Sequence, residues 1–224
     1  MNDHILINYN TNRHPLSWVK GLINFYIGSG YVSQNTFLTL SVYSHIPQSF
    51  SDNRRLVSLP FSQLNEGHIF NIISSLQEGE ELAFHSKIHD FGLEYHIPLI
   101  DFGNVDRGII DQEPLRELSH KWGMNFNIYN SGRSFHAYGN KLINSNEWIQ
   151  FMGSLLLLNI PSGFKLIDER WVGHRIMAGY SALRWSNNSS RYKKTPTYIG
   201  YFNQEGFFEQ KQYIHSSFHN DFIG

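Results

Sequence analysis

The chain has 224 residues, and its 41% hydrophobic and 15% aromatic content suits a packed domain rather than a disordered segment. It contains no cysteine, which excludes disulfides and thiolate zinc sites. The formal net charge of −1 excludes a bulk polycation, and no apolar run reaches the roughly 20 residues of a membrane helix. The first residues lack a signal-peptide pattern, so we expect a cytoplasmic protein without membrane contact.

Residues 1–94 are predicted to form an α/β portion that packs on the rest of the chain. The apolar spacing at its start is helical, and later segments alternate in the manner of strands. In chain order, the expected elements are a helix over residues 15–26, a strand over 36–43, a helix over 63–77, and a β-hairpin formed by 81–88 and 93–100. These residues match no family feature, and they could bind a protein partner.

Residues 95–224 form the second predicted portion, and both portions are expected to make one compact unit. In chain order, we expect a strand ending before Asp101, a helix from Asp111 to Trp122, a hairpin of residues 125–129 and 135–138, a helix capped by Ser145, a helical segment over 170–180, and a strand-like tail from Tyr198. This order predicts an α+β fold with an antiparallel or mixed sheet and flanking helices.

Two aspartates follow apolar runs that read as strands. Asp101 follows residues 95–100, and Asp168 follows residues 163–167. Divalent cations that handle nucleotide phosphates bind carboxylate oxygens and keep positions for water and phosphate. Asp101 and Asp168 are therefore candidate metal ligands, and Asp106 could fold back as a third. For any one aspartate taken alone, a turn or helix cap is the commoner role.

The sequence Ser-Gly-Arg-Ser-Phe-His at residues 131–136 places hydroxyls, a guanidinium, an imidazole and backbone amides on one tight turn. Arginine binds phosphate oxygens through its forked N–H groups, and hydroxyls with amides can complete the cradle. Ser134 and His136 would point to the same face, because side chains alternate along a strand. The alternative interpretation is a hairpin turn with a partly buried histidine.

Positive charge gathers in residues 165–194, which hold seven lysines and arginines against Asp168 and Glu169, a net charge of +5. Such a window favours phosphate binding, although a solvated charged surface is an equally good interpretation. Trp171 and Trp185 lie within it and could stack on bases or pack in the core.

Taken in order, these motifs resemble the archaeo-eukaryotic primase superfamily over about residues 95–200. The elements that carry the resemblance are Ile-Asp-Phe-Gly at 100–103, the turn at 131–136, Leu-Ile-Asp at 166–168, and Leu-Arg-Trp-Ser at 183–186. The resemblance implies a primase-polymerase (RRM-like) catalytic core. It also implies a metal-dependent nucleotidyltransferase that uses Mg²⁺ or Mn²⁺ and acts on nucleoside triphosphates and single-stranded nucleic acid.

The same resemblance implies roles for single residues. Asp101 and Asp168 would be catalytic metal ligands, with Asp106 as the candidate third. The triphosphate would be bound by residues of the turn, namely Ser131, Arg133, Ser134 and His136. The basic segment near phosphate or template would supply Arg184, Ser186, Lys193 and Lys194.

One position departs from the family pattern. The first motif of the family normally has two aspartates separated by one residue, whereas Gly103 stands two places after Asp101. Either Asp106 replaces the missing ligand, or one ligand is lost, or the protein is no longer a polymerase. The alternative function is therefore a catalytically degenerate nucleotide or nucleic-acid binding protein, acting as a sensor or accessory subunit. A template-free small-molecule nucleotidyltransferase is a weaker third hypothesis.

Overall fold

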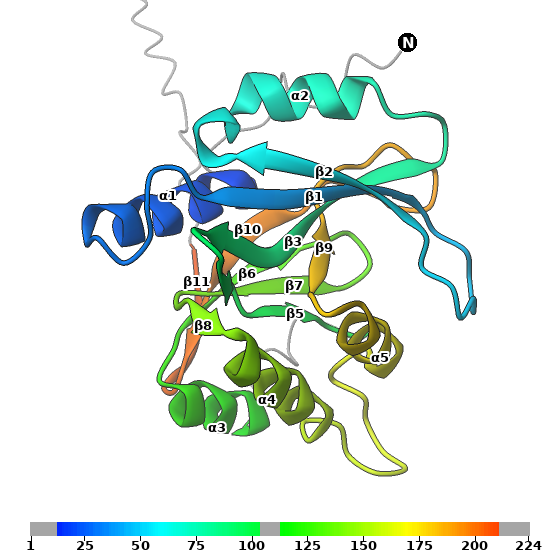
Figure 1. Cartoon of the computed structure of the whole chain (residues 1–224). Coiled ribbons are helices and arrows are strands. Elements are labelled where there is room, and N and C mark those ends of the chain that lie inside the picture. Colours follow the sequence, from blue (N-terminus) through cyan, green and yellow to red (C-terminus); the bar gives the residue numbers. More distant parts are fainter. Residues whose placement is uncertain (1–12, 104–112, 211–224) are drawn as a thin grey trace, which may run out of the picture.

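The computed structural model describes residues 13–103 and 113–210, which form two antiparallel β-sheets and five α-helices (Figure 1). The predicted α+β class with antiparallel sheets and flanking helices is thus confirmed. Within these described ranges, no helix combines the length and the apolar character of a membrane span.

The first sheet has the strand order β2-β1-β3-β4-β8, and β9 also pairs with β3. Its strands are β1 (Phe37–Ser44), β2 (Arg54–Pro60), β3 (Glu80–Asp90), β4 (Leu93–His96), β8 (Ile143–Asn144) and β9 (Ala182–Arg184). The β3–β4 hairpin is the one predicted, with Asp90 opposite Leu93. This hairpin spans residue 94, and β8 and β9 come from later in the chain, so both portions of the sequence contribute strands to the sheet.

The second sheet has the order β11-β10-β6-β7-β5. Its strands are β5 (Leu99–Asp101), β6 (Phe126–Asn130), β7 (Phe135–Gly139), β10 (Thr197–Asn203) and β11 (Gly206–Glu209). The predicted β6–β7 hairpin is present, with Asn130 opposite Phe135. The single strand expected over residues 93–100 is wrong, because the chain leaves the first sheet after His96 and enters the second at Leu99. Pro98, which has no N–H for a ladder, lies at this crossing.

The helices are α1 (Pro15–Gly28), α2 (Glu66–Ser74), α3 (Glu113–Trp122), α4 (Ser145–Leu156) and α5 (Glu169–Ala178), with a short 3₁₀ helix η2 (Phe61–Gln63). Figure 1 shows α2 on the outer side of the first sheet and α3 to α5 beyond the second sheet. The predicted Ser145 cap is wrong by one residue: Asn144 caps α4 in a reciprocal pair of bonds with Glu147. The predicted start of α3 at Asp111 lies outside the described residues.

The second sheet has apolar residues on both faces, and their alternation sets the direction of the polar side chains. Ile100 and Ala137 pack in the core shared with α3 and α4, whereas Leu99 and Tyr138 pack in the core on the side of the first sheet. Because side chains alternate along a strand, Asp101 and His136 share the direction of Leu99 and Tyr138. Both therefore face the space between the two sheets.

Candidate functional site

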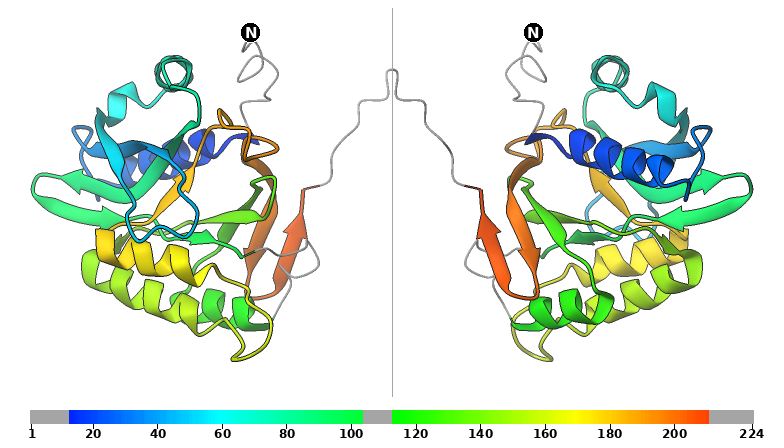
Figure 2. Two further views of the ribbon diagram at one scale, coloured as in Figure 1. Left: turned by 90° about the vertical axis from the view of Figure 1, so that its right-hand side faces the viewer. Right: turned by 90° about the vertical axis from the view of Figure 1, so that its left-hand side faces the viewer.

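A cavity of about 460 Å³ opens between the two sheets and α5, within the size range of small-molecule sites. One side, called here the motif wall, is formed by residues 101–103, Ser131, Arg133, Ser134, His136 and Asp168. The other side, called the loop wall, is formed by residues 43–49 and 51–54. Figure 2 shows the β1–β2 loop extending from the first sheet toward α5. The cavity thus joins the predicted motifs to a segment that no motif had indicated.

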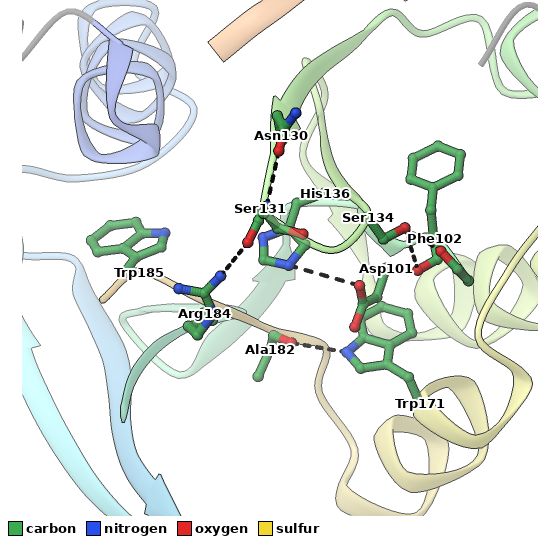
Figure 3. Close-up of polar contacts among 12 residues, drawn as sticks. Asp101, Phe102, Asn130, Ser131, Ser134, His136, Trp171, Ala182, Arg184 and Trp185 are labelled. Carbon is green, nitrogen blue, oxygen red and sulfur yellow. Dashed lines mark hydrogen bonds and ion pairs between the residues drawn. The ribbon is translucent and has the colours of Figure 1, made fainter. Parts of the chain in front are cut away.

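The end of β5 brings three predicted residues together. Asp101 is directly opposite His136 in the β5–β7 register, and His136 Nε2 lies 3.7 Å from Asp101 Oδ1 (Figure 3). Beyond the strand, Phe102 makes an isolated antiparallel bridge with Ile167. The Asp168 N–H donates to the Asp101 carbonyl at 3.2 Å, next to this bridge. Residues directly opposite each other in an antiparallel pair point their side chains to the same face, and Asp101 is opposite Asp168. The two carboxylates are therefore neighbours.

The surroundings of Asp101 disfavour its charge. Burial and, to a smaller extent, the charge of Asp168 raise the pKa of Asp101 to about 8, although Arg184 acts in the opposite direction. Burial, with a smaller effect of Arg184, holds the pKa of His136 well below its usual range. At neutral pH the imidazole is therefore uncharged, and Asp101 either keeps a proton or requires a cation beside it.

Asp168 also has a local role, which corrects its predicted position at a strand end. Residues 163–167 form no strand apart from the single bridge at Ile167, and Asp168 is the N-cap of α5. Its Oδ1 accepts from the Trp171 N–H at 3.0 Å. This cap satisfies one of the free N–H groups at the start of α5. It holds Asp168 at the cavity edge.

The turn at residues 131–136 is held by its own backbone. Asn130 Oδ1 accepts from the Gly132 N–H at 2.9 Å, and the Ser131 N–H donates to the Ser134 carbonyl at 2.9 Å. Gly132 has φ +100°, and a Cβ there would lie 3.2 Å from the Lys194 backbone nitrogen. Glycine is therefore required for both backbone conformation and space. Arg133 projects at the exposed tip of this turn.

Two residues that were expected to hold substrate bond the backbone instead. Ser134 donates its hydroxyl to the end of β5, with the Phe102 carbonyl at 3.0 Å (Figure 3). Arg184 is buried, and it donates to the carbonyls of Ser131 at 2.6 Å and Lys194 at 3.2 Å, and to that of Ser186. Both line the cavity, but their polar groups connect the segments of the motif wall. A direct role for them in substrate binding stays a prediction.

Three further predicted residues, Ser186, Lys193 and Lys194, do not line the cavity. Ser186 is buried, donates to Glu81 and accepts from the Leu82 N–H at 2.8 Å. The backbone of Lys193 and Lys194 packs against Gly132, and neither lysine is among the lining residues. Asp106 lies outside the described residues.

The cavity carries more positive charge than the motifs alone predict. Among the described residues that line it, six are arginines and three are aspartates, with histidines at positions 45, 136 and 174. The basic window of the sequence already contained Arg170, Arg175 and Arg191. Arg54 and Asp52, however, lie in a segment without any recognisable motif. The excess of arginine makes the cavity suited to an anion with several charges.

A metal ion would find two carboxylates here and a restricted third position. Asp101 and Asp168 are neighbours, but within the described residues no group of three or more His, Asp or Glu side chains could hold a metal. At Gly103, a Cβ would lie 2.9 Å from the Lys165 carbonyl oxygen, and the Gly103 N–H donates to the Leu166 carbonyl at 2.9 Å. An aspartate at this position would therefore require the backbone to move. The departure from the two-aspartate motif is accommodated by the local packing.

Comparison with known proteins gives one match. The model of the archaeo-eukaryotic primase 1D-like family matches residues 60–197. Searches among curated proteins and among solved structures found no match. The matched range covers more than half of the chain, includes the whole motif wall, and begins earlier than the resemblance seen in the motifs. The chain therefore belongs to the archaeo-eukaryotic primase 1D-like family.

Proposed function

We propose that the cavity binds a nucleoside triphosphate and transfers its nucleotidyl group to the 3′-hydroxyl of a nucleic-acid strand. The observation that carries this proposal is the pairing of Asp101 with Asp168 beside the Arg133 turn. These residues come from three separate segments of the chain. Neighbouring carboxylates next to an arginine-lined cavity suit a reaction in which a metal and phosphate groups meet.

The carboxylates fit a divalent cation by their chemistry. The raised pKa of Asp101 reflects burial and the neighbouring Asp168, and a cation beside the two would relieve both effects. Asp101 and Asp168 would hold Mg²⁺ or Mn²⁺, with phosphate and water oxygens completing the shell, as Mg²⁺ commonly requires. When bound, such a cation supplies charge neutralisation at the phosphates and activation of the attacking hydroxyl.

The residues of the chain would then position the substrates. Arg133, exposed at the tip of the turn, would fork onto the phosphate oxygens, and neutral His136 would keep Asp101 in place. The 3′-hydroxyl of the strand would lose its proton to solvent as its oxygen attacks the α-phosphorus. The bond from that phosphorus to the bridging oxygen would break, and pyrophosphate would leave. Arginines around the cavity would stabilise the negative charge of the departing pyrophosphate as well as that of the incoming triphosphate.

A second candidate is a nucleotide-binding protein without chemistry. The packing at Gly103 favours it, because the position of the second motif aspartate has no room for a side chain. In this case the arginines and the turn would keep their binding role, while the two carboxylates would not assemble a working metal site.

One experiment separates these candidates. The purified protein is incubated with labelled nucleoside triphosphates, Mg²⁺ or Mn²⁺, and a single-stranded template, and Asp101→Asn is compared with the surface control Glu94→Gln. We expect products longer than one nucleotide, reduced about 100-fold or more in Asp101→Asn with triphosphate binding retained. No product, but saturable triphosphate binding that Arg133→Gln weakens, would support the second candidate. Absence of both product and binding would contradict both.

A further inference from the structure

A second cluster of charges lies where the loop wall meets α5, away from the motifs. Asp52 Oδ2 accepts from Arg54 Nε at 2.8 Å and also from Arg175 Nη2 of α5. Arg175 is 1% exposed, and the side chain of Arg54 is 9% exposed. Arg54 Nη1 additionally donates to Ser41 Oγ at 3.2 Å. All three charged residues line the cavity.

This cluster has an unbalanced charge. Two buried guanidinium groups share one carboxylate oxygen, and within the described part of the chain Arg175 Nε and Nη1 have no hydrogen-bond partner. Burial of a cation is costly unless an anion and hydrogen bonds compensate it. The rings of Tyr43 and Tyr180 lie against Arg54 and Arg175, with the guanidinium carbon 4.1 and 5.5 Å from the ring centroid respectively, so Asp52 is, among the described residues, the single carboxylate that bonds the two arginines. The cluster therefore has one positive charge in excess.

A phosphate group would compensate this charge better than the single carboxylate does. It has more oxygens and up to two negative charges, and paired guanidinium groups match its geometry. Asp52 belongs to the β1–β2 loop, which contacts α5 through Asp52 and through a bond from Arg170 to the Ser49 carbonyl at 3.0 Å. Asp52 lies outside β2, whereas Arg54 begins β2 and Arg175 lies in α5, so a shift of the loop would separate Asp52 from both arginines.

We propose that Arg54 and Arg175 form a second phosphate-binding subsite of the cavity, and that Asp52 is the internal anion which a phosphate group displaces. The subsite is separate from the Arg133 turn. The assignment of the ligand rests on the proposed function. If that function holds, the phosphate bound by this subsite belongs to the second substrate. That substrate is either a nucleic-acid strand or a second nucleotide, and both offer the same phosphate chemistry.

Binding measurements on charge variants test the subsite. Calorimetry would use three probes: a nucleoside triphosphate, a short oligonucleotide with a 5′-phosphate, and the same oligonucleotide with a 5′-hydroxyl. We expect Asp52→Asn to bind at least one phosphorylated probe about tenfold more tightly, because the competing anion is gone. Arg175→Lys and Arg54→Gln should weaken the same probe by about tenfold. Arg55→Gln is the matched control, because Arg55 is exposed, adjacent in sequence and not part of the cavity lining.

The direction of the change in affinity caused by Asp52→Asn decides whether Asp52 competes with a phosphate group for the two arginines. If the Asp52 contacts only fasten the loop, Asp52→Asn will bind the probes equally or more weakly than the wild type, and the subsite is refuted. A gain for the triphosphate assigns the subsite to a second nucleotide, and a gain limited to the 5′-phosphorylated oligonucleotide assigns it to a strand. The double variant Asp52→Asn with Arg133→Gln separates this result from the proposed function. Its affinity for the probe should still exceed that of Arg133→Gln alone, because the subsite is separate from the Arg133 turn. Melting curves identify any variant that is unfolded. If Arg175→Lys fails to fold, Arg54→Gln replaces it as the test of the subsite.

Discussion

The two walls of the cavity are built by different kinds of contact. On the motif wall, polar groups bond the backbone: Asp168 to the Asp101 carbonyl, Ser134 to the Phe102 carbonyl, and Arg184 to the Ser131 carbonyl. On the loop wall, long side chains make the contacts to α5, as in the Arg175–Asp52 pair. The motif wall is therefore held by bonds to its backbone, whereas the loop wall meets α5 through arginine side chains.

The largest effect should come from Arg184, on which the motif wall depends. Arg184→Met would leave the carbonyls of Ser131 and Lys194 without their buried donor, and we expect a loss of about 3 kcal/mol in the free energy of unfolding. Arg170→Met is the control at the loop wall, because exposed Arg170 of α5 makes a bond to the Ser49 carbonyl of that wall, and its loss should cost less than about 0.5 kcal/mol. Urea denaturation measures both. Equal losses in the two variants would show that the walls do not differ as described.

Acid should weaken the region beneath the loop wall. His85 bonds Ser41, which also accepts from Arg54, and stacks on Tyr180 at 3.9 Å between ring centroids. Burial, then the charges of Arg54 and Lys87, lower the pKa of His85 to about 3. The unfolded chain binds this proton near pH 6.5, so the neutral ring contributes its full stability above that value, and the contribution is lost as the pH falls toward 3.

At about pH 5 this histidine alone should cost about 2 kcal/mol relative to neutral pH. His14 and His96, whose pKa values are also lowered by burial, will add to the acid sensitivity of the wild type. Urea midpoints are measured across pH for the wild type and for His85→Gln. The difference between the two curves gives the contribution of His85 to the pH dependence of stability. A variant with an unchanged pH dependence would exclude His85 as a source.

The smallest effect concerns Gly103 at the end of the motif wall. Gly103→Ala places a Cβ 2.9 Å from the Lys165 carbonyl oxygen, and we expect a loss of about 1–2 kcal/mol in stability. The matched control is Gly153→Ala in α4, where nothing lies within 4 Å of the added atom and the helix should gain up to about 1 kcal/mol. Thermal unfolding compares them. A neutral Gly103→Ala would mean that the backbone there yields easily, and a second aspartate could then be restored.

Local patterns predicted the hairpins and most helices correctly, because turn residues and hydrophobic periodicity act over short distances. They failed where two local interpretations competed. The apolar run before Asp101 reads as one strand, yet Pro98 divides it between two sheets. Asp168 follows an apolar run, yet its side chain caps α5. In both cases the outcome depended on partners elsewhere in the chain.

The sequence by itself determined the hairpin turn of the motif wall, because that turn needs Gly132 and Asn130 nearby, and because its strands carry their own alternation. Tertiary structure alone decided the loop wall. Asp52 meets Arg175 across 123 residues, and no spacing in the sequence encodes such an ion pair. The same holds for the contact of Gly103 with Lys165. Charge and space at a site depend on which distant segments pack together, and this is decided only when the two sheets and α5 assemble.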